Sequence, residues 1–356
     1  MRRTRQRPQS PGGAAAAIDF QVARLGAVAL QGGGVLDDAR LAYKVFGRLQ
    51  AGRPVVVYPT SFATHHTDLE WLIGPGKALD PERLAIVMIN LFGSGLSSSP
   101  SNHDAGPQAF PKLTMHDNVH AQQRLMTEIL GVRRIALVVG FSMGAQAAFH
   151  WGALYPDLVE RIAPICGSAR TSRHNFVFLE GVKAALTADP TFRDGVFNAK
   201  PTQGLRAMGR VYAGWGLSAA FYRDETYLTL GFRSLEDFLV RDWEARFSRR
   251  DGNDLLAMIW TWQHADISLT PAWKGDLTRA LQAIAARALV MPSETDLYFS
   301  IEDSRSEAAA MPAATLLPIP TKWGHRVNVP AQNPADASFI DAALMAFLRP
   351  PQDPTG

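Results

Sequence analysis

The sequence has little cysteine and no long hydrophobic run. Cys166 is alone, so no disulfide can form within the chain, which favours a protein of the reducing cytoplasm. No stretch approaches the roughly 18 consecutive apolar residues of a membrane-spanning helix, so we expect no membrane partner. The apolar run 14–18 behind an Arg-rich start is shorter than the ~7–15 residues of a secretory signal core.

Excess charge of one sign is also scarce. The chain carries 36 Lys and Arg against 33 Asp and Glu, a net charge of +3. Four of these cations are arginines within the first seven residues, so the rest of the chain is close to neutral. Nucleic-acid binding requires clustered positive charge on a folded surface, and we therefore expect no nucleic-acid partner.

The chain alternates between two kinds of segment. Residues 1–16 are polar, without periodicity, and are predicted to be a disordered tail. Short aliphatic runs bounded by Gly, Pro, Ser or Asn then alternate with helix-like segments, which is typical of a parallel sheet flanked by helices. The runs are 55–58, 84–90, 135–139, 162–165, 288–291 and 315–319.

This alternation stops over residues 172–281, which are rich in Trp and Arg and have helical periodicity. We predict an α/β core formed by residues 17–171 and 282–350. The intervening residues 172–281 are predicted to be an inserted helical lid.

The pentapeptide Gly140-Phe-Ser-Met-Gly144 lies between a predicted strand and a predicted helix. A serine on such a tight turn has a strained backbone, and glycines two residues before and after it relieve the crowding. This context is typical of the nucleophile elbow of the α/β-hydrolase fold, so we predict that Ser142 is a catalytic nucleophile.

A serine hydroxyl needs a base and an orienting carboxylate, which in this fold follow it in the order acid, then histidine. Asp296 follows the run 288–291, and His325 follows the run 315–319 behind Gly324. We predict a triad of Ser142, Asp296 and His325, with Glu294 as the alternative acid.

The oxyanion of an acyl-transfer intermediate requires two N–H donors. One should be the backbone N–H of Met143, the residue after the nucleophile. The other should come from the loop after 55–58, where we choose the Ser61 N–H with Thr60 as the alternative.

Metal and nucleotide motifs are incomplete. His65 and His66 are adjacent rather than spaced to share a face, and no HExxH or CxxC pattern is present. The glycine clusters 32–34 and 93–95 lack dinucleotide and P-loop spacing. We therefore expect no metal and no cofactor.

Several segments together resemble the homoserine O-acetyltransferase branch of the α/β-hydrolase superfamily. This resemblance implies an acyl-serine intermediate, a helical lid over a deep site, and often a dimer packed through the lid. The similar segments are 90–100 (NLFGSGLSSSP), 110–122, 140–151, 155–157, 167–172, 296–299 and 324–325.

The sequence departs from that branch at the acceptor side. Arg326 stands where the acetyltransferases have an aspartate for the substrate amino group, and a gapless alignment puts Gly209 and Gly216 at their substrate-holding arginine and tyrosine. An ammonium facing Arg326 would be repelled, so we do not expect homoserine as the acceptor. Arg326 and Arg210 are the predicted substrate-binding residues.

We predict a serine enzyme that hydrolyses a small acyl ester or thioester. The alternatives are an O-acyltransferase from an acetyl-CoA-type donor to a small alcohol other than homoserine, and a catalytically silent binding protein of the same fold.

Overall fold

The computed structural model describes residues 19–349, so the predicted tail and residues 17, 18 and 350 of the predicted core lie outside the described residues. Eight strands form one sheet in the order β1-β2-β4-β3-β5-β6-β9-β10. Six of them run parallel, which confirms the predicted α/β class. These are β3 (Val55–Pro59), β4 (Ala85–Ile89), β5 (Leu137–Phe141), β6 (Arg161–Ile165), β9 (Arg287–Val290) and β10 (Ala314–Leu316).

All six predicted strands are present with bounds shifted by a few residues, whereas the edge hairpin was not predicted. Strands β1 (Gln21–Ala29) and β2 (Val35–Phe46) pair antiparallel, and β2 also pairs antiparallel with β4. Their side chains alternate between exposed and buried for much of their length. They therefore lack the continuous apolar runs that marked the inner strands.

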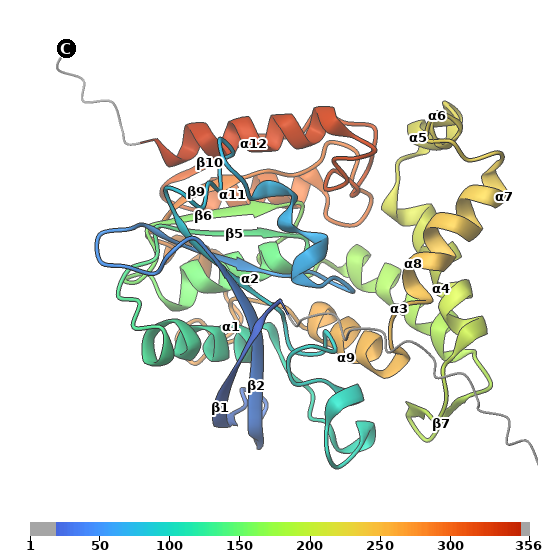
Figure 1. The fold of residues 1–356 in the computed structure, drawn as a ribbon, viewed down its shortest axis with the longest axis horizontal. Helices are drawn as coiled ribbons and strands as arrows, with labels where there is room; N and C mark the ends of the chain where they lie inside the picture. The colour runs from blue at the N-terminus through green and yellow to red at the C-terminus, as the bar shows by residue number, and fades with distance from the viewer. Residues whose placement is uncertain (1–18, 350–356) are drawn as a thin grey trace, which may run out of the picture.

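Helices cover both faces of the sheet (Figure 1). Successive residues of β3 point to opposite faces of the sheet. Val57 packs into the core on the α1 and α2 side, and Val56 packs into the core beneath α12. The core helices are α1 (Met115–Arg124), continued by the π-helical turn η5 (Leu125–Ile129), α2 (Met143–Leu154), α10 (Leu277–Gln282), α11 (Ile301–Ala310) and α12 (Pro334–Leu348). Short 3₁₀ turns are η1 (His66–Asp68), η2 (Glu70–Leu72), η3 (Pro100–Asn102) and η4 (Pro107–Ala109).

A group of helices between β6 and β9 stands beside the carboxyl ends of β5 and β6 (Figure 1). We call residues 173–263 the helical insert. It contains α3 (Arg173–Thr187), the small hairpin β7 (Phe192–Arg193) and β8 (Val196–Phe197), α4 (Thr202–Gly216), α5 (Ala219–Arg223), α6 (Thr226–Thr229), α7 (Leu235–Phe238), η6 (Leu239–Glu244), α8 (Ala245–Phe247) and α9 (Gly252–Gln263).

The predicted lid also included α10, which the structure places against α11 of the core. Within residues 19–349, no helix has the length and apolar character needed to cross a membrane.

Candidate active site

Ser142 lies at the turn between β5 and α2. Its backbone has φ 58° and ψ −120°, a conformation that residues other than glycine rarely adopt. The two flanking glycines are required by close contacts. A Cβ on Gly140 would lie 2.0 Å from the Gly144 carbonyl oxygen, and one on Gly144 would lie 2.7 Å from the Pro59 oxygen. The predicted elbow geometry and its steric reason are therefore both present in the structure.

Asp296 and His325 meet at the ends of neighbouring strands. Asp296 Oδ2 lies 2.6 Å from His325 Nδ1, and its Oδ1 accepts the backbone N–H groups of Tyr298 and Phe299 at 3.1 Å each. The Asp296 side chain is fully buried. Since Nδ1 donates to this carboxylate, Nε2 is the nitrogen left to act as a base. Glu294, the alternative acid, is exposed.

The imidazole is also held next to the elbow by aromatic contacts. The ring of Phe141, the residue before Ser142, lies 4.7 Å from the His325 ring, and Tyr298 lies 4.6 Å from it on centroid distances. No hydrogen bond joins Ser142 Oγ to His325 in the described part of the chain. In enzymes without substrate this bond is often long and tightens when substrate binds.

The predicted oxyanion donors differ in availability. Met143 begins α2, and its N–H has no acceptor within residues 19–349. The Ser61 N–H, by contrast, donates to Thr64 Oγ1 at 2.8 Å, and the Thr60 N–H donates to the Ile89 oxygen at 2.9 Å. The N–H groups of the next two residues, Phe62 and Ala63, have no acceptor among the described residues, and Phe62 is the one adjacent to the predicted Ser61.

The loop that carries these donors lies directly beside the elbow. Ser61 Oγ donates to the Phe141 oxygen at 2.8 Å, and a Cβ on Gly144 would approach the Thr60 oxygen to 3.0 Å. The loop and the N-terminus of α2 therefore face one another across the serine.

Aromatic side chains from core and insert form a wall around the imidazole that sequence reasoning did not assign. Trp262 of α9 stacks on Phe299 at 5.5 Å and lies 5.5 Å from Phe62. Phe178 of α3 stacks on Tyr298 at 4.6 Å. Ser142 itself is only 3 % exposed.

Both arginines predicted to bind substrate are engaged by carboxylates. Arg326 Nη1 lies 2.5 Å from Asp242 Oδ2 in η6, and its guanidinium lies over the Trp243 ring. Arg210 pairs with Glu236 and Glu244, and Glu236 holds the pKa of Arg210 above its usual range. Neither arginine therefore presents a free charge to a substrate.

Trp243 lies against both glycines at the acceptor side, with its ring at Gly216 and its backbone at Gly209. A Cβ on Gly216 would lie 2.5 Å from the Trp243 ring, and one on Gly209 would lie 2.9 Å from the Trp243 backbone oxygen. Trp243 is 2 % exposed and takes the space beside both positions.

One potential cation cluster lies among the described residues, and none of its members belongs to the proposed triad. Asp19, His66 and Glu70 bring ligand atoms together there. The Lys44 ammonium, 2.7 Å from Asp19 and 2.8 Å from Glu70, already supplies positive charge. Its hydrogen bond lowers the pKa of Asp19 to about 2.

Residues 54–325 match the family model described as the alpha/beta hydrolase fold. The chain belongs to the α/β-hydrolase family. This hydrolase is 37 % identical to an ethyl acetate hydrolase of Pseudomonas veronii, over 86 % of this chain and 89 % of that one. It is 32 % identical to a homoserine O-acetyltransferase of Zymomonas mobilis, over 81 % and 86 % of the two chains, which confirms the predicted branch.

A solved structure of the acetyl esterase MekB matches with a TM-score of 0.89 at 35 % identity, covering 92 % of this chain and 96 % of that one. Named esterases and acyltransferases among the relatives establish that this hydrolase is an enzyme.

Proposed function

We propose that this enzyme hydrolyses small acyl esters through an acyl-serine intermediate. The observation that carries the proposal is the buried Asp296–His325 pair beside the strained serine of the elbow. His325 Nε2 takes the proton from Ser142 Oγ as the oxygen attacks the ester carbonyl. The backbone N–H groups of Met143 and Phe62, which have no acceptor among the described residues, stabilise the oxyanion.

The intermediate then loses its alcohol, and water completes the reaction. The protonated His325 gives its proton to the leaving alkoxide, which leaves an acyl group on Ser142. His325 next deprotonates a water molecule that attacks the acyl carbonyl, and the carboxylic acid leaves as Oγ regains the proton.

The proposed substrate is an ester with a short acyl chain such as acetate. The aromatic wall of Phe62, Phe178, Trp262 and Tyr298 supports this size, and so do two relatives, an ethyl acetate hydrolase and an acetyl esterase.

Water is favoured over an amino alcohol as the second nucleophile. Trp243 fills the space beside Gly209 and Gly216. Arg326 stands where the acetyltransferases have an aspartate; it is paired with Asp242 and cannot accept a substrate ammonium. The transferase relatives keep O-acyl transfer to another small alcohol as the second candidate.

The direct test measures hydrolysis of ethyl acetate and p-nitrophenyl acetate by the wild type and by Ser142→Ala. The variant should fold normally and lose about 10⁶ in kcat, as other serine enzymes do. Near-normal turnover by Ser142→Ala, or the absence of a fluorophosphonate adduct on Ser142 of the wild type, would exclude the serine mechanism.

Whether water or an alcohol is the second nucleophile is tested by adding a panel of small alcohols, homoserine included, to reactions with p-nitrophenyl acetate or acetyl-CoA. Acetate release without alcohol supports hydrolysis. Acyl product that forms only when an alcohol is present would instead establish the transferase.

The finer partner predictions stay proposals. The insert has four exposed apolar side chains, which support a homodimer formed through it: Val177, Leu228, Leu235 and Val240. Sedimentation at micromolar concentration tests this, and a monomer would contradict it. The acyl-CoA donor and the cytoplasmic location also stay predictions.

A further inference from the structure

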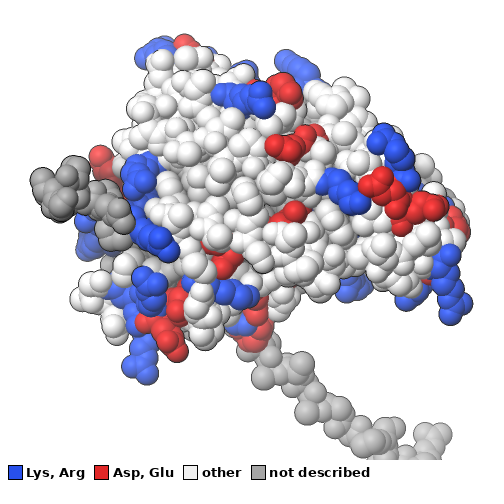
Figure 2. Space-filling view, turned by 90° about the horizontal axis from the view of Figure 1, so that it is seen from above, with Lys and Arg blue, Asp and Glu red and all other residues white. Residues whose placement is uncertain are grey.

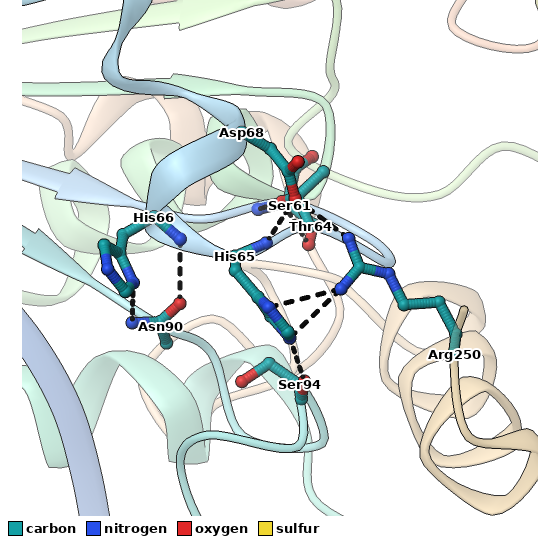
Figure 3. A network of polar contacts seen from close by, with 8 residues as sticks. All are labelled: Ser61, Thr64, His65, His66, Asp68, Asn90, Ser94 and Arg250. Atoms are coloured by element: carbon teal, nitrogen blue, oxygen red, sulfur yellow. Dashed lines mark hydrogen bonds and ion pairs between the residues drawn. The ribbon is translucent and has the colours of Figure 1, made fainter. Parts of the chain in front are cut away.

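One arginine ties the loop of residues 61–68 to the helical insert (Figure 3). Arg250 lies between α8 and α9. Its Nη2 donates to Asp68 Oδ2 at 2.9 Å, and its Nη1 lies 3.2 Å from the ring nitrogens of His65. The same Asp68 oxygen accepts the His65 backbone N–H at 2.9 Å. The loop and the insert are thus joined through a shared carboxylate and an imidazole.

The hydrogen bonds determine which nitrogen of His65 carries the proton. Nε2 lies 2.9 Å from the Ser94 carbonyl oxygen, and a carbonyl only accepts, so Nε2 donates. Nδ1 therefore offers its lone pair to Arg250. Burial, and then the charge of Arg250, lower the pKa of His65, which keeps the ring neutral beside the guanidinium.

The same loop is also packed against the insert by its apolar side chain. The Phe62 ring lies parallel to Tyr212 of α4 at 6.1 Å, and it contacts Phe247 of α8 at 6.5 Å and Trp262 of α9 at 5.5 Å. The backbone N–H of Phe62 has no acceptor among the described residues. The position of this N–H thus depends on contacts with the insert.

We propose that Arg250 is a positioning residue for the acyl-serine reaction: through His65 and Asp68 it locks the 61–68 loop against the insert and so sets the oxyanion donors of the loop. This inference rests on the proposed function. Arg250 acts through its two partners and does not touch the reacting atoms. An arginine suits this task because its planar fork reaches two acceptors at once, which a lysine ammonium does less well.

The contacts of Arg250 with His65 and Asp68, which we call the latch, should affect the transition state more than substrate binding, since charge develops on the oxyanion only during reaction. Arg250→Gln should lower kcat on p-nitrophenyl acetate at least about tenfold, with less than about a threefold change in KM. This is smaller than the ~10²–10³ lost when an oxyanion donor is removed outright. Arg250→Lys should recover part of the lost rate.

Arg249→Gln is the matched control, because Arg249 is the exposed neighbour and makes no ion pair within residues 19–349. It should match the wild type in kcat, KM and urea unfolding. Fluorophosphonate labelling of Ser142, which forms a tetrahedral adduct, should slow in Arg250→Gln and stay unchanged in Arg249→Gln.

Asp68→Asn provides a second variant that preserves the volume of the loop, and it should lower kcat at least about threefold. A folded Arg250→Gln or Asp68→Asn protein whose kcat equals that of Arg249→Gln would overturn the latch while the esterase activity of the wild type stands. If the wild type neither hydrolyses the ester nor labels at Ser142, the proposed function itself fails.

Discussion

Breaking the buried ion pair between Arg326 and Asp242 should destabilise the fold by an amount that depends on which partner is removed. The two side chains are 7 % and 11 % exposed. Arg246 shares the same carboxylate at 3.8 Å, and the nearby charge of Arg326 lowers the pKa of Arg246 to about 10. One aspartate therefore compensates two guanidinium groups, which both lie against the Trp243 ring.

This arrangement makes the two single substitutions unequal. Asp242→Asn preserves shape but leaves two like charges without a counterion, so it should cost about 3–5 kcal/mol, the range for removing one partner of a buried pair. Arg326→Met removes one cation and leaves Asp242 paired with Arg246, so it should cost roughly half as much. Because Arg246 is 38 % exposed, solvent screens part of its repulsion and the Asp242→Asn value should not exceed this range.

Urea unfolding of both variants and of the double variant measures these free energies, provided that the m values agree with that of the wild type. The double variant should be more stable than Asp242→Asn, since it removes one of the two uncompensated cations. A cost below about 1 kcal/mol for Asp242→Asn, or a greater cost for Arg326→Met, would refute the shared-carboxylate reasoning.

Three further substitutions test the site and its surroundings. Asp296→Asn should lower kcat for ester hydrolysis by about 10⁴ with stability nearly unchanged, because the amide favours the wrong histidine tautomer; a loss under tenfold would contradict this. Gly144→Ala should reduce both stability and activity, since its Cβ would lie 2.7 Å from the Pro59 oxygen, and thermal unfolding checks it. Glu307 is buried, with a pKa raised by burial to about 8, so the folded state binds the proton more tightly than the unfolded state and the free energy of unfolding should fall as pH rises from about 4.5 to about 8. Glu307→Gln should remove this fall, and parallel urea titrations across that range would show an unchanged slope if the reasoning is wrong.

The fold and the strand-end positions of the three proposed triad residues could be predicted because their signals are local. Inner strands of a parallel sheet are continuous apolar runs, and their carboxyl ends meet at one edge of the sheet. Ser142, Asp296 and His325 each follow such a run, and the structure joins Asp296 to His325 at that edge. The β1–β2 hairpin could not be predicted from continuous apolar runs, because its side chains alternate between exposed and buried.

The charged partners could not be predicted, because they depend on contacts between distant parts of the chain. Arg326 finds Asp242 84 residues away, and no local pattern marks that pairing. The hydrogen bond that occupies the Ser61 N–H, by contrast, could have been expected from the local sequence. Thr64 lies three residues ahead, and a hydroxyl at that spacing often binds the backbone of a turn.

Gly209 and Gly216 show why the acceptor side of the site changes as a unit. They are seven residues apart on α4, about two helical turns, so they lie on one face of that helix. By sequence they only weaken a helix, but the structure packs Trp243 against both. A larger side chain at Gly216 would displace the indole, and with it the surface on which Arg326 lies beside Asp242. An amino alcohol could therefore be accommodated only if all of these residues changed together, which is why a buried indole at this position favours water as the nucleophile.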